Sequence, residues 1–114
     1  MPKALMVVGS NPTSADTEQD FNDWYTNTHL DDVISVPGYN RATRYRLHPV
    51  RPLPGVGESR FRYLAIYEVE VDDLATAAAD LESALENGQV PLIDALDRDM
   101  SVDFYELIED AQRP

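Results

Sequence analysis

Segment 60–69 constrains the fold more than any other part of the chain, because it is apolar on both sides. Read as a strand, it places alternate residues on two faces, Phe61, Tyr63, Ala65, Tyr67 and Val69 on one and Leu64 and Ile66 on the other. A strand with two apolar faces has to be covered on both. We therefore expect a sheet with helices on one face and a further layer on the other.

Three more strands are predicted from short apolar or alternating runs that end in turn residues. Residues 3–9 predict a buried strand rich in Val, residues 39–47 alternate regularly, and residues 101–108 predict the last strand. Alternation places Tyr45 on the same face as Tyr39, which we take as the inward face. Three Pro and two Gly in residues 48–57 predict a loop before the third strand.

A first helix is expected to begin with Asp16 or Thr17 as its N-cap. At helical spacing one stripe gathers polar and aromatic side chains, with His29 at its edge: Phe21, Trp24, Tyr25 and Thr28. Leu30 and Ile34 fall on the opposite side. We therefore expect this helix to bend or to start again after His29.

A second helix is predicted after Asp72 and Asp73, which supply its N-cap, and it ends at Gly88. Its apolar stripe indicates an amphipathic helix packed on a sheet. Pro91 opens one further short helical turn that runs through Leu96.

The order strand-helix-strand-strand-helix-strand is that of an α+β, ferredoxin-like βαββαβ fold. In this fold two helices cover one face of a four-stranded antiparallel sheet and leave the other face open. Here the open face carries apolar and aromatic residues, which a small monomer rarely exposes. We expect residues 1–114 to form a single domain and a second copy to cover the open face, which gives a homodimer.

The net charge of −12 and the pI near 4.3 argue against nucleic acid or an anionic membrane as a partner. The chain has no Cys, and its two His residues do not have the spacing of a metal site. It contains neither a phosphate-binding glycine loop nor a nucleophile elbow, so we expect no metal and no cofactor. The apolar run at residues 4–8 is too short for a signal segment, and we expect a cytoplasmic protein.

The helix segment Phe21-x-x-Trp24-Tyr25-x-x-x-His29-Leu30, followed by Pro37-Gly38 and a strand with Arg41 and Tyr45, resembles the dimeric α+β barrel superfamily and within it the EthD-like branch. The resemblance implies the fold and the dimer. That superfamily includes isomerases, polyketide cyclases, cofactor-free and haem-degrading monooxygenases, and its EthD-like branch has no shared reaction, so the chemistry does not follow from the resemblance. Relatives often carry Pro where this chain has Asp31.

His29 is the leading candidate for proton transfer, since an imidazole titrates near neutral pH; the alternative is a helix-ending His bonded to a carbonyl. Trp24 and Tyr25 are candidates for substrate binding or for core packing. Tyr45 and Tyr67, as catalytic phenols, and Tyr63, as a binding residue, can donate to a substrate carbonyl, although Tyr also suits half-buried strands.

Arg41 is a candidate for binding a substrate carboxylate, against the alternative of pairing with the many acidic residues. We expect a pocket between the first helix and the sheet of the same subunit, lined by Tyr25, His29, Tyr45 and Tyr67.

Two kinds of function fit these residues. One is a cofactor-free acid/base enzyme of cyclase, isomerase or dehydratase type, acting on a small hydrophobic carbonyl or enol metabolite, with a monooxygenase of the same superfamily as a related option. The other is a non-catalytic protein that binds a small molecule or has an accessory role. A water-accessible cavity that keeps polar groups favours the enzyme, whereas a barrel filled with side chains favours the accessory role.

Overall fold

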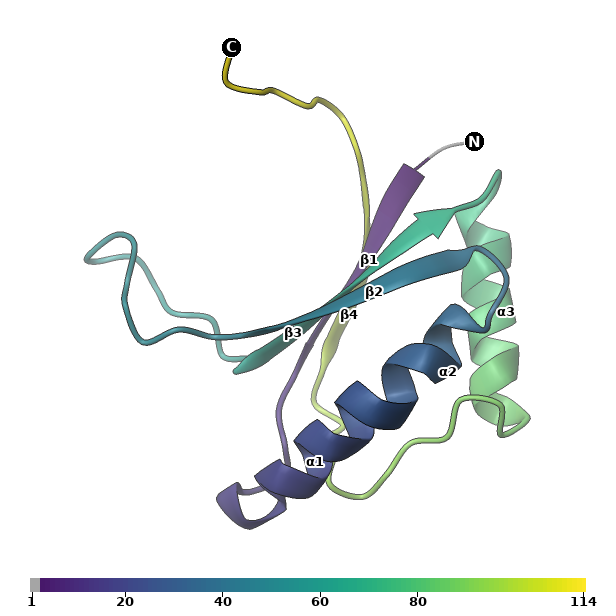
Figure 1. Ribbon diagram of the computed structural model, residues 1–114, viewed down its shortest axis with the longest axis horizontal. Helices are drawn as coiled ribbons and strands as arrows, with labels where there is room; N and C mark the ends of the chain where they lie inside the picture. Colours follow the sequence, from purple (N-terminus) through teal and green to yellow (C-terminus); the bar gives the residue numbers. More distant parts are fainter. Residues whose placement is uncertain (1–2) are drawn as a thin grey trace.

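The computed structural model describes residues 3–114 and shows four strands and two helical segments (Figure 1). The first helical segment is continuous but has four parts, and the second is a single helix. The elements are β1 Lys3–Ser10, η1 Ala15–Thr17, α1 Glu18–Trp24, η2 Tyr25–His29, α2 Leu30–Ile34, β2 Tyr39–Arg46, β3 Tyr63–Glu70, α3 Leu74–Glu86 and β4 Ser101–Glu106. Among residues 3–114, no helix has the length and apolar character needed to cross a membrane.

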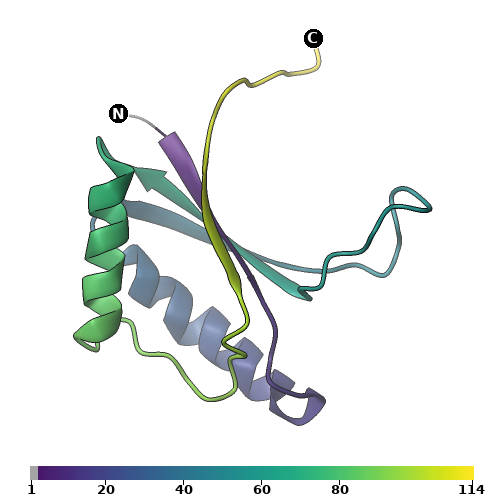
Figure 2. The same ribbon diagram turned by 180° about the vertical axis from the view of Figure 1, so that it is seen from behind.

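The strands form one sheet in the order β2-β3-β1-β4, and all neighbouring strands are antiparallel. Both helical segments lie on the same face of this sheet, and the opposite face is open (Figures 1 and 2). The predicted ferredoxin-like βαββαβ fold is thereby confirmed, with two helices on one face of a four-stranded antiparallel sheet.

The core lies between the helices and the sheet and is built from alternate strand residues. On β1 and β3 the buried residues face the helices: Ala4, Met6, Val8, Tyr63, Ala65, Tyr67 and Val69. The helices contribute Phe21, Tyr25 and Val33 from the first helical segment and Ala77 and Ala84 from α3. The doubly apolar character of β3 is explained, because its other face is the open side of the sheet.

A π-helical turn, η2, interrupts the first helix between α1 and α2. Each π turn holds one residue more than an α turn, so it shifts the helix's phase. The shift lets Phe21, Tyr25, His29 and Val33 all be buried at intervals of four residues. The predicted break near His29 is therefore a change of helix type at Tyr25–His29, and it turns Thr28 to the surface, contrary to the stripe expected from a regular helix.

A β-bulge near the start of β2 changes which residues face the helices. Tyr39 pairs with Val69 and Arg41 with Glu68, so one extra residue lies between the two pairs. A bulge of this kind inverts the alternation that follows it. Tyr39 therefore faces the helices, but Arg41 and Tyr45 lie on the open face, and the predicted inward orientation of Tyr45 is wrong.

Two further expectations are corrected by the structure. Residues 91–96 form no helix; they run irregularly, with a turn at Asp94 and Ala95, and Leu96 makes an isolated bridge to Pro12. This bridge takes the place of the helical turn expected after Pro91. The last strand ends at Glu106, two residues earlier than predicted.

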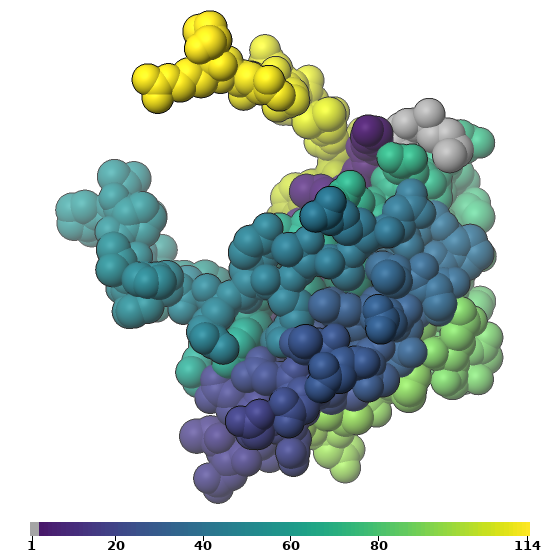
Figure 3. All heavy atoms as spheres, in the orientation of Figure 1, coloured from purple at the N-terminus to yellow at the C-terminus, as the bar shows by residue number. Residues whose placement is uncertain are grey.

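The loop after β2 and the chain after β4 both stand away from the body of the molecule (Figures 1 and 3). The radius of gyration is 15.4 Å, compared with about 13 Å for a compact domain of this length. Val50, Leu53 and Val56 are exposed on the loop, and Leu107 and Ile108 on the C-terminal segment. These extensions reach out on the side away from the helices.

Candidate active site

A cavity of about 100 Å³ lies between the helices and the sheet of the subunit. Most of its lining is aliphatic or Met, from both helical segments, from β1 and β4 and from the segment that joins α3 to β4: Met6, Val8, Val33, Leu81, Leu85, Val90, Leu92, Leu96, Met100 and Val102. The remaining lining residues are Tyr25, His29 and Tyr67. Three hydrogen-bonding side chains thus meet in an otherwise apolar space.

The π turn positions two of these three side chains. Tyr25 and His29 are its first and last residues and are both buried. Their rings meet edge to face with centroids 4.8 Å apart, and Trp24 stacks on His29 at 4.4 Å. Phe21 packs against Tyr25 at 5.5 Å and anchors the preceding turn. The aromatic contacts on either side fix the imidazole in place.

His29 is a buried imidazole with an unsatisfied nitrogen. The residue is 8% exposed, and within residues 3–114 its Nδ1 has no hydrogen-bond partner. Burial, and secondly the positive charge of Arg44, lower the pKa of His29 from 6.5 to about 4. His29 is therefore neutral at pH 7. It does not end the helix by bonding a carbonyl through Nδ1.

Two phenols lie beside this imidazole. Burial raises the pKa of Tyr25, and the nearby hydroxyls of Tyr67 and Ser10 and the positive charge of Arg44 offset part of this rise. Burial also raises the pKa of Tyr67, and the neighbouring Tyr25 adds to the increase. Both hydroxyls are consequently protonated at neutral pH and can donate. The hydroxyl oxygens of Tyr67 and Ser10 have no partner at hydrogen-bonding geometry among the described residues.

Arg44 supports the site from β2, although regular alternation from Tyr39 predicts that it faces away from the helices. Its guanidinium lies 4.5 Å from the centre of the Tyr25 ring, a cation–π distance. Its Nη1 donates to Thr26 Oγ1 at 2.8 Å and its Nη2 to Asn22 Oδ1 at 2.9 Å. Arg44 lies on the same face of β2 as the half-buried Ala42. This face points toward the helices because of the bulge.

Tyr63 belongs to a polar network next to the cavity and does not line the cavity itself. Its hydroxyl accepts from Asn22 Nδ2 at 3.1 Å and donates to the Glu18 carboxylate. Glu18 also pairs with Arg62 at 3.1 Å. This network and Arg44 tie β2 and β3 to α1, so they hold the helix over the sheet.

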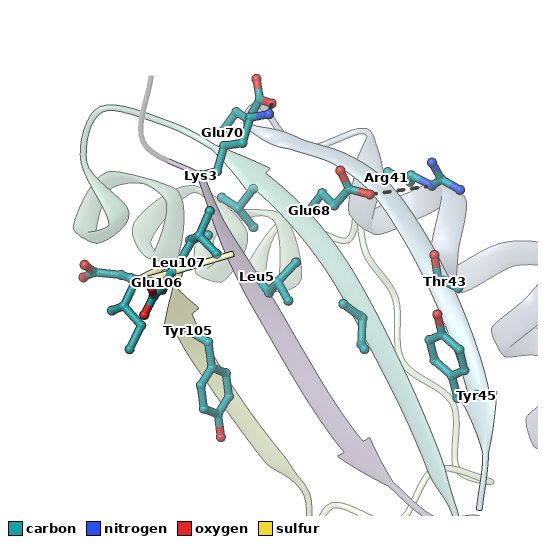
Figure 4. Close-up of a pocket in the computed structure, with 15 residues that line it drawn as sticks. Lys3, Leu5, Arg41, Thr43, Tyr45, Glu68, Glu70, Tyr105, Glu106 and Leu107 are labelled. Atoms are coloured by element: carbon teal, nitrogen blue, oxygen red, sulfur yellow. Dashed lines mark ion pairs between the residues drawn. The ribbon is translucent and has the colours of Figure 1, made fainter. Parts of the chain in front are cut away.

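Arg41 and Tyr45 lie on the opposite face of the sheet and take no part in the inner cavity. Tyr45 is 53% exposed, and Arg41 Nε lies 3.6 Å from the Glu68 carboxylate. Both line a larger hollow of about 700 Å³ on the open face, which also includes Leu5 and Tyr105 (Figure 4). For Arg41 the structure shows pairing with an acid, the alternative considered from the sequence.

The inner cavity is the better candidate for a reaction site than the larger hollow. The Nδ1 of His29 and the hydroxyl of Tyr67 are buried there without a hydrogen-bond partner among the described residues, whereas buried polar groups normally have one. The hollow is open, its charged groups Arg41 and Lys3 pair with Glu68 and Glu70, and its apolar side chains are exposed. Those features are typical of a surface that another protein layer covers. Among residues 3–114, no three His, Asp or Glu side chains are placed so that they could hold a metal ion.

No family model matches this chain, and no curated protein matches it in sequence. Solved structures do match it in fold. An ethyl tert-butyl ether d (EthD) family protein of Bacillus halodurans is 20% identical, with a TM-score of 0.55 over 95% of this chain and 100% of that one. HapK of Hahella chejuensis is 15% identical, with a TM-score of 0.62 over 97% and 98%.

A dimeric ferredoxin-like protein from an uncultured marine organism is 12% identical, with a TM-score of 0.57 over 97% of this chain and 100% of that one. At these identities the similarity shows the fold. The chain shares a ferredoxin-like fold with these proteins, and an EthD family protein is among them, as the resemblance predicted.

Proposed function

We propose that the protein is a cofactor-independent acid/base enzyme that acts on a small hydrophobic carbonyl or enol compound, with His29 as the residue that transfers the proton. One observation carries this proposal. A neutral imidazole with an unpaired, buried Nδ1 lies beside two protonated phenols in an otherwise apolar cavity. The cavity keeps polar groups instead of being filled, which favours an enzyme over an accessory protein.

The proposed step is the removal of a proton from the carbon next to a carbonyl. In the tautomer with its proton on Nε2, the Nδ1 lone pair of His29 accepts this proton. The electrons of the broken C–H bond move to the carbonyl oxygen and form an enolate, which accepts hydrogen bonds from the Tyr25 or Tyr67 hydroxyl. Return of the proton from His29 to another carbon completes an isomerisation. Alternatively, attack of the enolate carbon on a second carbonyl closes a ring, and the alkoxide that forms takes the proton back from His29.

The low pKa of His29 is compatible with this role. Burial opposes the imidazolium when it is the only charge in the cavity. During the step an enolate forms beside it, and an opposite charge a few ångströms away favours the charged form in a medium of low dielectric constant. The neutral imidazole is thus present at pH 7, and the product of the transfer is an ion pair.

The test is the exchange of the acidic protons of acetylacetone, a small 1,3-dicarbonyl compound, followed by NMR in D₂O. The protein should accelerate the exchange, and His29→Gln should remove the acceleration while the urea midpoint stays close to that of the wild type. His48→Gln is the matched control, because His48 is exposed on the loop after β2. Equal exchange with wild type and His29→Gln would leave a binding or accessory role as the better explanation.

The homodimer is the second part of the proposal. Leu5, Leu64, Tyr45 and Tyr105 are exposed together on the open face, and a small soluble chain rarely leaves such a patch bare. One of the structures that share the fold is a dimeric ferredoxin-like protein. A second copy placed sheet against sheet covers the hollow on this face and leaves the inner cavity of each subunit intact. The small metabolite is then bound within one subunit.

A further inference from the structure

The large apolar side chains that are exposed fall into three groups, and one of them lies at the inner cavity. One group is on the open sheet face and the tail, and a second is on the loop after β2. The third consists of Leu85, Leu92 and Val102, which are 40%, 37% and 48% exposed and also line the cavity. Residues that are both exposed and part of the lining mark the place where the cavity opens.

This mouth lies between three segments that are neighbours in the fold. Leu85 is in the last turn of α3, Leu92 is in the segment that joins α3 to β4, and Val102 is on β4. The connecting segment runs from the end of α3 back to β4 beneath the sheet (Figure 2). Tyr25, His29 and Tyr67 lie on the first helix and on β3. The polar side chains of the cavity therefore come from the first helix and β3, and its apolar rim comes from α3, β4 and the segment between them.

The charge of the ligand follows from the lining. No charged side chain lines the cavity in the described part of the chain. A carboxylate or an ammonium group would lose its hydration there without a charged partner, which costs far more than a neutral carbonyl that accepts one hydrogen bond. The head group is thus neutral.

The length of the ligand follows from the volume. At about 100 Å³ the cavity is well below the roughly 300–1,000 Å³ of pockets that enclose a drug-sized ligand, so a carbonyl group and a few carbons fill it. A longer ligand has to extend through the opening. The exposed rim offers it apolar contact there, and those side chains lose water when a hydrocarbon covers them.

We infer that the cavity takes a neutral, elongated carbonyl compound head first, with its carbonyl at Tyr25, His29 and Tyr67 and its alkyl or aryl tail leaving over Leu85, Leu92 and Val102. The inference rests on the proposed function for the position of the reacting group. It adds the charge, the shape and the direction of the substrate. The occupant of the rim is the tail of this ligand and not a segment of a second subunit.

The single Trp of the chain makes binding measurable without a label. Trp24 stacks on His29, so a head group placed there changes the fluorescence of the indole. The wild-type protein is titrated with methyl ketones from methyl ethyl ketone to methyl nonyl ketone. The affinity should rise with each added methylene by up to about fourfold, and the rise should continue beyond the length that fills the cavity. A fatty acid of equal length should bind at least tenfold more weakly.

Variants of the rim test the direction. Leu92→Ser and Val102→Thr should each weaken the long ketones several-fold more than methyl ethyl ketone. Leu53→Ser is the control, because Leu53 is 62% exposed but lies on the loop after β2; it should change neither. An affinity that stops rising with the shortest ketones, an equal loss for short and long ketones, or tight binding of the fatty acid would each overturn the inference. So would rim variants whose main effect is on sedimentation, because the rim would then be a subunit contact.

The proposed function can fail separately from this inference. If the ketone series behaves as expected but acetylacetone exchange is not accelerated, the enzymatic function is contradicted and the orientation of the ligand is supported. If exchange depends on His29 but binding does not depend on chain length, the orientation is contradicted and the enzymatic function is supported.

Discussion

At the scale of single residues, the buried imidazole of His29 links stability to pH. Its pKa is about 4 in the folded chain and about 6.5 when unfolded. Between these values the unfolded chain binds the proton and the folded chain does not, so the free energy of unfolding falls as the pH drops from about 7 to about 4. The His29 contribution to this loss is roughly 3 kcal/mol at pH 4.

The measurement is urea unfolding of the wild type and His29→Gln at several pH values in this window. The many carboxylates titrate in both proteins, so they cancel in the difference between them. The free energy of unfolding of the variant should rise relative to that of the wild type by roughly 3 kcal/mol from pH 7 to pH 4. His48→Gln should follow the wild type. Parallel curves for the wild type and His29→Gln would contradict a buried, neutral imidazole.

Arg44 is the other residue whose effect can be isolated. Its positive charge is the second cause, after burial, of the low pKa of His29. Arg44→Met removes the charge, so the pKa of His29 should rise toward 6.5 but stay below it because the ring is still buried. NMR titration of the imidazole signals measures this directly, since the chain has only two His residues.

The matched control for Arg44 is its neighbour on the same strand face. Arg46 lies 6.0 Å from the Tyr63 ring and is not among the causes of the His29 shift. Arg46→Met should therefore leave the pKa of His29 where it is. An identical pKa in the wild type and Arg44→Met would mean that burial alone accounts for it.

At the scale of elements, the sequence predicts the number, order and type of the main elements, because their periodicity and end signals are strong. It fails at three irregular places. The bulge in β2 inverts the alternation, so Tyr45, which was expected to line the cavity, and Arg41, a candidate for binding the substrate, both face away from it. No residue type near Asn40 indicates a bulge. The bulge depends on the pairing of β2 with β3, which is a long-range contact.

The π turn was predicted only as a break. The change in the apolar pattern after His29 is visible in the sequence, since Leu30 and Ile34 do not continue the stripe. Whether a helix accommodates such a change by bending or by forming a π turn depends on what its two halves pack against. Segment 91–96 is the third case, where the bridge of Leu96 to Pro12 prevails over a local preference for a helical turn.

The need for the π turn can be tested by removing one residue from it. Asn27 is exposed within the turn. Deletion of Asn27 removes the one residue that a π turn holds beyond an α turn, and at about 100° per residue it leaves Tyr25 and Val33 seven residues apart on one face of a regular α-helix. The core contacts are then kept, so the free energy of unfolding should fall by less than about 2 kcal/mol.

Asn27→Ala is the control for the deletion, since it keeps the length of the turn. As a surface substitution it should change the free energy of unfolding by no more than about 0.5 kcal/mol. Both are compared by urea unfolding, with far-UV circular dichroism to confirm that the helices are retained. A deletion that prevents folding, or that loses helix content, would show that the π turn itself is required.

At the scale of the whole molecule, the extended shape and the distribution of apolar groups point to the same arrangement. The loop after β2 and the C-terminal segment reach beyond the body without packing on it (Figures 1 and 3). Leu5 and Tyr105 oppose each other on neighbouring strands of the open face. A partner that covers this face also gives the extensions a surface to contact, which explains why a short chain keeps apolar residues on them.

The purified protein should therefore sediment at about twice 12.8 kDa at micromolar concentration. Leu5→Glu places a charge at the centre of the expected interface on both copies, so it should lower the mass to that of one chain. Ala78→Glu is the control: it adds the same charge on the exposed side of α3 and should leave the dimer intact. A wild-type protein that sediments as a single chain would contradict the covered open face.

Salt gives this last prediction an independent check. Each copy carries a net charge of −12, so two copies repel each other at long range, while the contact itself is apolar. Screening by salt weakens the repulsion over a Debye length of about 10 Å at 0.1 M and leaves the apolar attraction in place. The dimer should consequently dissociate at a lower protein concentration as the ionic strength rises. An interface held mainly by ion pairs between the two copies would show the opposite dependence, so a dimer that weakens in salt would contradict an apolar contact.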